Sequence, residues 1–408
     1  MQKVVIIGSG ASGLISAIYA AKNNNQVIIL ERNNNCGKKL LLTGNGKCNY
    51  WNTDQDLKHY HTQNPLILNK IITKTNQQEI LTFFDHIGII PRIKNGLYYP
   101  YSNQSVSICY ALLLEAELLG IKIINNFLVD KIIVKNKQFI IKSNQEEIIA
   151  DKLIIATGSK ANPKTGSDGN GYELVKSLNH SIIKPLPALV SLKGEENYFK
   201  KWKGIRTDVT LSLYHNESKI KEESGEIQLT DYGISGICVF NLSNVVTKLL
   251  DQKQNVKIKI DFLPYLKLSI EDLISFIDKR NQMLKKRNIG ELFDSLLNYK
   301  LVNILLTESK INPKKSWNDL NNKQKKLVAQ NLKQFSLKIT DTNSFEKAQV
   351  CSGGVPLTEI NYQTMESLKV KGLYIVGELL DVVGDCGGYN LSFAWISGML
   401  AGKAISDN

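Results

Sequence analysis

The sequence that decides the fold reads Val4-Val5-Ile6-Ile7-Gly8-Ser9-Gly10-Ala11-Ser12-Gly13. Its apolar run predicts a short parallel strand that is buried on both faces. The glycines that follow match G-x-G-x-x-G, the turn that joins strand to helix in a dinucleotide-binding unit. Gly8 permits the tight turn, Gly10 lets the backbone approach a pyrophosphate, and Gly13 lets helix and strand pack closely.

The residues beyond this turn complete the unit. The segment from Ser12 to Asn24 is predicted to be a helix whose first N–H groups and positive dipole point at the phosphates. Val27-Ile28-Ile29-Leu30 is the next buried strand, and Glu31 closes it 18 residues past Gly13. A carboxylate at this position binds ribose hydroxyls and repels a 2′-phosphate, which favours FAD or NAD over NADP. We expect Asn24 to end the helix in left-handed geometry.

The periodicity changes twice along the rest of the chain. Residues 188–262 alternate apolar and polar side chains, which predicts antiparallel strands with one solvated face. Residues 269–334 are basic and predict helices. The other expected elements are helices at 75–90, at 104–119 and from about 389, and strands within 121–155, 336–350 and 373–377. The sequence therefore predicts one α/β domain, interrupted by a β domain that carries a helical insert.

The composition excludes several classes of protein. Hydrophobic residues make up 43% and charged residues 22% of 408 residues, as in ordinary globular proteins. No apolar run approaches the ~18 residues of a membrane span, and the opening run meets Gly8 too early for a signal peptide. The six cysteines are widely spaced and the histidines form no H-E-x-x-H motif, which argues against disulfides and a metal site. We expect a cytoplasmic protein that has no membrane partner.

The net charge of +13 raises the question of nucleic-acid binding. About half of the excess lies in residues 261–340, which hold fifteen Lys or Arg against eight Asp or Glu. These charges lack the interleaved aromatic residues of a single-strand binder. We interpret them as a solvated basic face, so a nucleic-acid partner is not expected.

A glycine- and lysine-rich segment, Gly37 to Asn49, follows Glu31 directly. We expect it to wrap phosphate, ribitol and an aromatic ring edge. Within it, Cys48 is interpreted as a buried small residue rather than a redox thiol, because no resolving cysteine is adjacent.

Three later stretches suit further cofactor contacts. Ala156-Thr157-Gly158 ends an apolar strand and offers a second backbone approach, while Val129 is either an adenine contact or a core residue. Gly377-Glu378 places a carboxylate where it can hold a ribitol hydroxyl. A helix that starts after Gly388 would stabilise the negative charge of a reduced flavin ring through its dipole.

Taken together, these motifs resemble the bile-acid-dehydroreductase/aminoacetone-oxidase family of FAD-binding proteins, the BaiN-like flavoproteins. The resemblance spans essentially the whole chain and implies non-covalently bound FAD, a β-barrel domain with a helical insert, and no separate NAD(P)H domain. The matching stretches are Gly8 to Gly13, Glu31, Gly37 to Lys39, Thr43 to Asn49, Tyr99 to Ser102, Gly233 to Gly236, Gly353 to Val355, Thr364 to Ser367, Gly377 to Asp381 and Gly387 to Asn390. The chain departs from the family pattern at Lys47, Leu97, Asp231, Ile237 and Ser392.

The expected fold is α/β, with a Rossmann-like FAD-binding domain (1–187 and 351–408) interrupted by an antiparallel β-barrel domain (188–262 and 335–350) with a helical insert (263–334). The expected cofactor-binding residues are Gly8, Gly10, Ala11, Ser12, Gly13, Glu31, Arg32, Lys38, Lys39, Thr43, Gly44, Asn45, Cys48, Asn49, Val129, Ala156, Thr157, Gly158, Gly377, Glu378, Gly388, Tyr389, Asn390 and Leu391. No catalytic residue and no metal ligand is assigned, and the sequence does not choose between Tyr389 and Cys48 as proton donor.

The expected activity is an FAD-dependent oxidoreductase that passes a hydride through flavin N5 between NAD(P)H and a small organic acceptor such as an activated alkene or ketone. NAD(P)H would be a transient donor, since the one dinucleotide fingerprint is used by FAD. Three alternatives stay open: an amine oxidase that uses O2, a tRNA-modifying flavoprotein, and a non-catalytic flavin-binding module. The sequence leaves substrate and oligomeric state undetermined.

Overall fold

The computed structural model describes residues 1–144 and 146–406, which form two compact units. Unit 1 consists of residues 1–188 and the chain from Phe345 onward, and unit 2 is Leu189–Ser344. At the start of the second segment of unit 1, Phe345 O accepts a hydrogen bond from Asn162 N at 2.8 Å.

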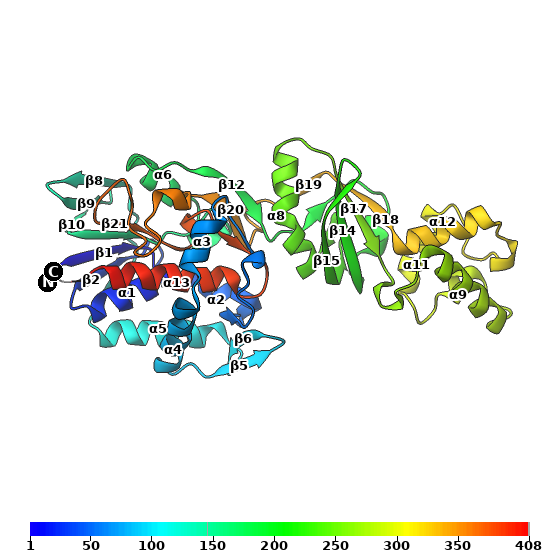
Figure 1. The fold of residues 1–408 in the computed structure, drawn as a ribbon, viewed down its shortest axis with the longest axis horizontal. Helices are drawn as coiled ribbons and strands as arrows, with labels where there is room; N and C mark the ends of the chain where they lie inside the picture. The colour runs from blue at the N-terminus through cyan, green and yellow to red at the C-terminus, as the bar shows by residue number, and fades with distance from the viewer. Residues whose placement is uncertain (145, 407–408) are drawn as a thin grey trace. The chain divides into compact units, whose positions relative to one another are not determined.

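A five-stranded parallel sheet forms the centre of unit 1. Its order is β21-β11-β1-β2-β7, so the first strand of the chain is in the middle (Figure 1). The strands are β1 (Lys3–Ile7), β2 (Gln26–Leu30), β7 (Lys122–Ile124), β11 (Lys152–Ile155) and β21 (Leu373–Ile375). Because the sheet is covered on both faces, β1 and β11 are almost continuously apolar and buried. The predicted α/β class with a Rossmann-type sheet is confirmed.

Helices cover one face of this sheet, and a small antiparallel sheet covers the other (Figure 1). The helices are α1 (Ala11–Lys22), α5 (Ser105–Leu118) and α13 (Tyr389–Ala404), and the small sheet is β8 (Lys131–Lys135), β9 (Gln138–Lys142) and β10 (Glu147–Ala150). Helix α13 crosses α1 so closely that a Cβ at Gly398 would lie 2.5 Å from Ser12 O. This crossing fixes the last helix of the chain against the first one.

The remaining elements of unit 1 surround the carboxyl edge of the sheet and its helical face. They are α2 (Lys38–Leu42), a 3-10 turn (Thr43–Gly46), β3 (Trp51–Asn52), β4 (Tyr60–His61), α3 (Pro65–Ile71), α4 (Lys74–His86), β5 (Pro91–Lys94), β6 (Leu97–Pro100), α6 (Asn170–Ser177), β12 (Ile183–Ala188), β20 (Val350–Gly354) and β22 (Val383–Gly384). The helices predicted at 75–90, at 104–119 and from 389 are confirmed as α4, α5 and α13. Asn24 adopts the left-handed geometry expected of it, with φ 60°.

Unit 2 is built on a seven-stranded antiparallel sheet in the order β18-β17-β14-β15-β16-β13-β19. Its strands are β13 (Leu192–Lys193), β14 (Arg206–His215), β15 (Ser218–Leu229), β16 (Gly233–Ser235), β17 (Val256–Asp261), β18 (Phe335–Ile339) and β19 (Asp341–Thr342). The predicted alternation is present in β14, where Val209, Leu211 and Leu213 are buried. No pairing joins β18 to β19 within the described residues, so barrel closure stays a prediction.

Two helices of unit 2, a short one and a long one, were not expected. Residues 188–262 were predicted to be strands, but α8 (Ile237–Asp251) lies among them, after the short helix α7 (Phe199–Trp202). The prediction was wrong because Cys238, Val239, Leu242 and Val246 recur at helical rather than alternating spacing, and all four are buried.

Four α-helices lie between β17 and β18. They are α9 (Ile270–Met283), α10 (Ile289–Leu292), α11 (Tyr299–Glu308) and α12 (Asn322–Lys333). Each begins with a polar cap, and three of the four caps are asparagines whose side chains accept a backbone N–H. Across the described residues of both units, none of the helices combines the length and apolarity needed to cross a bilayer.

Candidate functional site

The predicted cofactor residues gather at the carboxyl edge of the parallel sheet. Strands β1 and β11 end at this edge, where Ala156 N donates to Ile7 O at 2.9 Å. A Cβ on Gly13 would lie 2.0 Å from Gly8 O, and one on Gly8 would lie 2.5 Å from Ala156 O. These two glycines are therefore required by the packing of the turn itself.

Gly10 is different, because nothing in the protein requires it to be glycine. It caps α1 with φ −75°, which any residue adopts, and no atom lies within 4 Å of a Cβ built there. Open space therefore lies over the first N–H groups of α1, where the helix dipole favours an anion. This space fits a pyrophosphate that approaches the backbone.

Glu31 directly follows β2, is buried, and accepts hydrogen bonds from the turn that joins β1 to α1. Its Oε2 accepts hydrogen bonds from Ser9 N (3.0 Å) and Ser9 Oγ (2.5 Å), and its Oε1 accepts from Asn33 N and Nδ2 (both 2.8 Å). The carboxylate is thus oriented beside the phosphate turn. Arg32, the next residue, instead forms an ion pair with Asp168 at 2.6 Å.

We expect the Glu31→Ala variant to lose both stability and cofactor. Removing the carboxylate leaves the buried N–H and hydroxyl of Ser9 and the partly buried N–H of Asn33 without this acceptor, which costs about 1–3 kcal/mol of unfolding free energy. FAD binding should weaken by a further ~1–3 kcal/mol, the scale of a charge-assisted hydrogen bond. Urea unfolding of the apoprotein and a flavin titration measure the two effects. A loss of stability with unchanged FAD affinity would mean that Glu31 only supports the turn.

Lys39 and Glu378 come together from distant parts of unit 1. Lys39 Nζ lies 2.6 Å from Glu378 Oε2, and Ser159 Oγ donates to the same oxygen at 3.3 Å. The other carboxylate oxygen, Glu378 Oε1, is buried and has no hydrogen-bond partner among the described residues. An orphaned buried acceptor at this edge suits a ligand hydroxyl, as a ribitol chain provides. The Thr157 hydroxyl is buried and unpartnered in the same way.

The segment from Gly37 to Asn49 is partly helical rather than a loop. Gly37 N donates to Ser9 O at 3.2 Å, which ties the start of α2 to the phosphate turn. A left-handed turn then follows, with positive φ at Gly44, Asn45 and Cys48. Cys48 is fully buried, and this burial raises the pKa of its thiol to about 12. Cys48 is therefore a protonated thiol at neutral pH and not a nucleophile.

The start of α13 is fixed by side-chain contacts. Gly388 has φ 94° and precedes Tyr389, while Asn390 binds both Gly384 N and Gly384 O at 2.8 Å. In the amide orientation that satisfies its partners, Asn49 donates to Trp51 O at 2.8 Å and accepts from Gly388 N at 3.2 Å. The predicted glycine-rich helix start is thus joined to the end of the 37–49 segment.

The structure therefore brings most of the predicted residues into three neighbouring groups of unit 1. The sheet-edge group is Gly8, Gly10, Ala11, Ser12, Gly13, Glu31, Ala156, Thr157, Gly158, Gly377 and Glu378, the α2 group is Lys38, Lys39, Thr43, Gly44, Asn45, Cys48 and Asn49, and the α13 group is Gly388 to Leu391. Val129 is buried in the segment that follows Phe127, whose N–H donates to Glu31 O at 2.9 Å. Its contact with adenine stays a prediction.

A cluster of titratable residues at the start of α13 was missed. Asp385 is buried, and its carboxylate lies 2.9 Å from His61 Nε2 and 3.4 Å from His59 Nδ1. His59 stacks on the Tyr389 ring at 4.6 Å, and its Nε2 lies 3.1 Å from an Asp54 oxygen. The alternation of the two histidines was a sequence signal. The position of Asp385 beside these histidines could not be predicted from the sequence, because it depends on the pairing of β22 with β4.

The phenol of Tyr389 is a very weak acid. Burial, together with the nearby carboxylates of Asp54 and Asp385, raises the pKa of its phenol to about 12. Its hydroxyl accepts a hydrogen bond from Asn52 Nδ2 at 3.0 Å. The described residues contain no group of His, Cys, Asp and Glu side chains arranged to hold a metal ion.

Comparison with known proteins gives consistent similarities. Residues 2–404 match the family model described as the HI0933-like protein Rossmann domain. The chain is 37% identical to the 3-dehydro-bile acid delta(4,6)-reductase of Clostridium scindens, over the full length of both. It is 27% identical to the ribosomal RNA dihydrouridine synthase of Haemophilus influenzae, over 98% of each chain.

Among solved structures, the 3-ketosteroid-delta4-(5alpha)-dehydrogenase of Rhodococcus jostii matches with a TM-score of 0.50 and 13% identity. The match covers 100% of this chain and 97% of the other one. At this identity the likeness concerns the fold alone.

Proposed function

The chain belongs to the HI0933-like Rossmann-domain family of BaiN-like flavoproteins, and we propose that it reduces a carbon–carbon double bond conjugated to a carbonyl group in a small organic substrate. It is an enzyme, an FAD-dependent oxidoreductase. The observation that carries the proposal is the sheet edge, where open space over Gly10 adjoins the carboxylates that would hold a dinucleotide. The reductase that is 37% identical supports the choice of a double bond.

The chain offers a separate group for each part of FAD. The N-terminus of α1 would hold the pyrophosphate, Glu31 the ribose, and the unpartnered Glu378 oxygen a ribitol hydroxyl. The start of α13 would lie at the ring, where its dipole favours negative charge. All of these contacts are non-covalent. When bound, FAD supplies hydride transfer between a nicotinamide and the substrate.

The reduction of a conjugated double bond also consumes a proton, and we assign its delivery to the histidine cluster. Asp385 lies within hydrogen-bonding distance of His61 and near His59, so its carboxylate can accept a hydrogen bond from a ring N–H and orient the rings. The side chains of His59 and His61 are about one-quarter exposed, which lets them exchange protons with solvent. The buried phenol of Tyr389 is too weak an acid for this role.

A transient nicotinamide donor follows from the single dinucleotide turn, and we propose ping-pong kinetics on one flavin. Anaerobic stopped-flow mixing with NADH, NADPH and primary amines tests the donor, and mixing of the reduced enzyme with a conjugated enone or with O2 tests the acceptor. Reduction by NAD(P)H and rapid reoxidation by the enone are expected. Reduction by amines with reoxidation by O2 alone would instead establish an amine oxidase.

The purified protein should be yellow and contain FAD rather than FMN. The phosphate turn and Glu31 serve the adenosine half of the cofactor, which FMN lacks. Acid release followed by chromatography identifies the flavin. Release of FMN, or a colourless protein that binds no added FAD, would contradict the proposed cofactor site.

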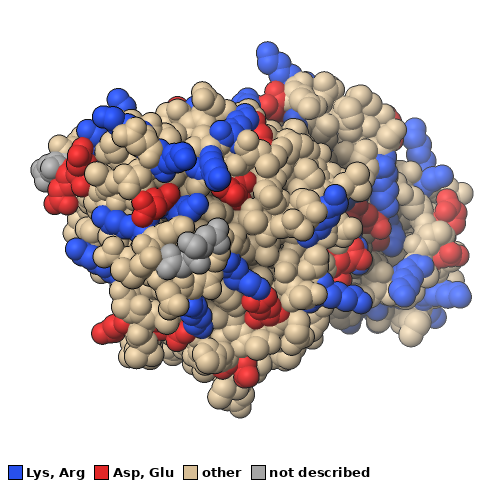
Figure 2. Space-filling view, turned by 60° about the vertical axis from the view of Figure 1, so that its left-hand side comes forward, with Lys and Arg blue, Asp and Glu red and all other residues tan. Residues whose placement is uncertain are grey.

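A second candidate function is the reduction of a uridine in RNA. It is supported by the 27% identity to a ribosomal RNA dihydrouridine synthase and by the basic helices of unit 2. However, the reductase relative is more similar in sequence. Basic side chains of these helices also pair with acidic ones, as Lys325 does with Asp278 at 2.8 Å, and Figure 2 shows acidic side chains interspersed among basic ones on the face that it draws. We therefore expect no tight RNA complex at physiological salt. A submicromolar complex that weakens steeply with salt would favour the RNA substrate.

A further inference from the structure

Helix α5 presents an apolar stripe to solvent. Val106, Tyr110, Leu114 and Leu118 recur every fourth residue and are 52%, 66%, 42% and 74% exposed. This spacing puts all four on one side of the helix. The opposite side is already used, since Ile108, Leu112 and Ala116 are buried in the core of unit 1. The helix is thus apolar on both sides, which is typical of a surface that a partner covers.

A basic and apolar hairpin adjoins the N-terminal end of this stripe. It consists of β5 and β6, and Tyr101 N donates to Ile90 O at 2.8 Å at its base. Ile90, Ile93 and Tyr101 are 68%, 53% and 71% exposed. Arg92 and Lys94 on β5 are exposed, and neither has an ion-pair partner in the described part of the chain.

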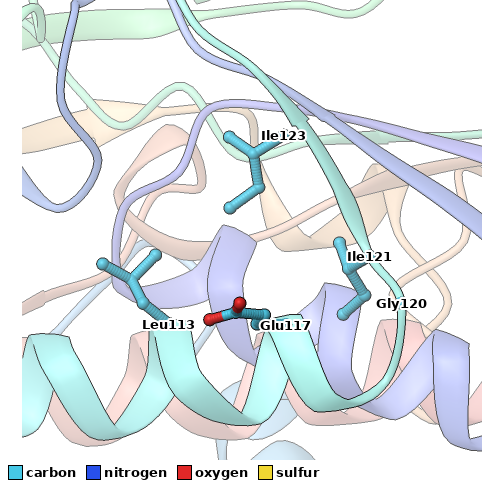
Figure 3. Close-up of a pocket in the computed structure, with 5 residues that line it drawn as sticks. All are labelled: Leu113, Glu117, Gly120, Ile121 and Ile123. Atoms are coloured by element: carbon cyan, nitrogen blue, oxygen red, sulfur yellow. The ribbon is translucent and has the colours of Figure 1, made fainter.

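A hollow of about 460 Å³ adjoins the other end of the stripe (Figure 3). Leu113 and Glu117 line it from α5, and Gly120, Ile121 and Ile123 line it from the segment that leads into the edge strand β7. Glu117 is exposed and has no ion pair among the described residues. The apolar stripe therefore has the exposed cations Arg92 and Lys94 of the hairpin at one end. At its other end it has the exposed carboxylate of Glu117 and the hollow.

We propose that this stripe is the interface of a symmetric dimer of the chain, in which the two α5 helices pack antiparallel. A two-fold axis perpendicular to α5, at the level of residue 112 and on the exposed side of the helix, brings Val106 of one copy opposite Leu118 of the other. It also brings each hairpin to the partner's hollow, where Tyr101 or Ile93 enters and Arg92 and Lys94 meet Glu117. Because both copies use the same patch, the contact between hairpin and hollow forms twice in the same interface. Such a two-fold interface gives a closed dimer rather than a longer chain of copies.

A second copy fits this surface better than a membrane does. A helix that lies on anionic lipid carries basic residues along its polar flank. Here α5 itself carries Glu115 and Glu117 and no lysine or arginine. Beside it, Lys22 is paired with Glu115, and Lys122 alternates along the chain with the Ile121 and Ile123 that line the hollow, so its side chain points to the other face of the sheet. A layer of anionic headgroups would repel Glu117, whereas an antiparallel second copy places Arg92 and Lys94 beside it.

A charge-swap experiment on the full-length holoenzyme tests the dimer. Light scattering and sedimentation velocity are expected to find a dimer for the wild type at micromolar concentrations. Glu117→Arg alone, and the double variant Arg92→Glu with Lys94→Glu alone, should each raise the dimer dissociation constant at least ~10-fold, and the triple variant should restore it to within about threefold. All three residues are exposed, so folding is not affected; retained FAD content checks this.

Tyr110→Glu at the centre of the stripe should raise the dissociation constant at least ~30-fold. Leu368→Glu is the matched control, because Leu368 is 63% exposed in unit 1 but outside the stripe, and it should leave the dimer unchanged. A wild-type monomer throughout the micromolar range would overturn the proposal, as would a dimer that neither the charge swap nor Tyr110→Glu weakens. Co-sedimentation of a monomer with phosphatidylserine vesicles that Tyr110→Glu abolishes would replace the dimer by a membrane contact.

Discussion

Replacing Gly10 by valine should yield a folded protein that does not retain FAD. The backbone of Gly10 has φ −75°, and the space around its Cβ position is empty, so the fold tolerates a side chain there. Its α1 cap makes no side-chain hydrogen bond, and the variant should lose at most about 1 kcal/mol of unfolding free energy. The added methyl groups would fill the volume assigned to the pyrophosphate. FAD affinity should therefore fall at least ~100-fold.

The measurement is a fluorescence titration of apoprotein with FAD, together with thermal unfolding in the absence of flavin. The matched control is Gly13→Ala, whose Cβ would lie 2.0 Å from Gly8 O and must displace the turn. This control should lose stability and FAD affinity together, whereas Gly10→Val should lose only affinity. Full FAD occupancy in Gly10→Val would mean that the pyrophosphate binds elsewhere.

Asp385→Asn should slow reoxidation of the reduced enzyme by a conjugated enone about 10²–10³-fold, the usual contribution of a general acid. Asparagine keeps a hydrogen-bonding group beside His61 but removes the carboxylate charge that faces and orients the ring. Reduction by NAD(P)H does not consume this proton and should change little. FAD affinity should also be preserved, because Asp385 is outside the three groups assigned to the cofactor.

Single-turnover stopped-flow measurements of each half-reaction separate these effects, and His61→Gln and His59→Gln identify which imidazole delivers the proton. His180→Gln is a control, because His180 is a buried histidine outside the cluster. It follows α6, and its Nδ1 lies 2.7 Å from Glu359 Oε2 and its Nε2 lies 2.8 Å from Ser367 Oγ. It should lower stability and leave the half-reactions unaffected. Equal slowing of both half-reactions in Asp385→Asn would show that the aspartate only shapes the site.

The sequence predicted what is encoded locally. The turn from Gly8 to Gly13, the strand that ends at Glu31 and the helix that begins at Tyr389 each follow from a few adjacent residues, and all are present. Even the left-handed turn at Asn24 follows from one side chain. Each of these features is determined by residues that are close together in the sequence, because backbone geometry and periodic burial act over only a few consecutive residues.

What the sequence did not predict depends on distant pairing or on misleading local propensity. The Lys39–Glu378 ion pair and the His61–Asp385 contact join residues more than 300 positions apart, and no spacing rule links them. Helix α8 was missed because its valines and aromatic residue favour strands locally, while burial of one side in unit 2 favours a helix. The sequence thus indicated Lys39 and Glu378 separately as candidate cofactor residues, but not the ion pair that joins them.

The tight crossing of α13 on α1 has a consequence for synthesis on the ribosome. The N-terminal half of unit 1 emerges early, but its sheet lacks β21 and its first helix lacks α13 as a neighbour until residues 373–404 are made. Unit 2 is one uninterrupted segment and emerges whole in the meantime. The nascent chain therefore exposes an incomplete apolar sheet for most of its translation, the kind of surface that chaperones bind. If Glu378 and α13 hold the flavin as proposed, flavin acquisition should follow the synthesis of these two segments.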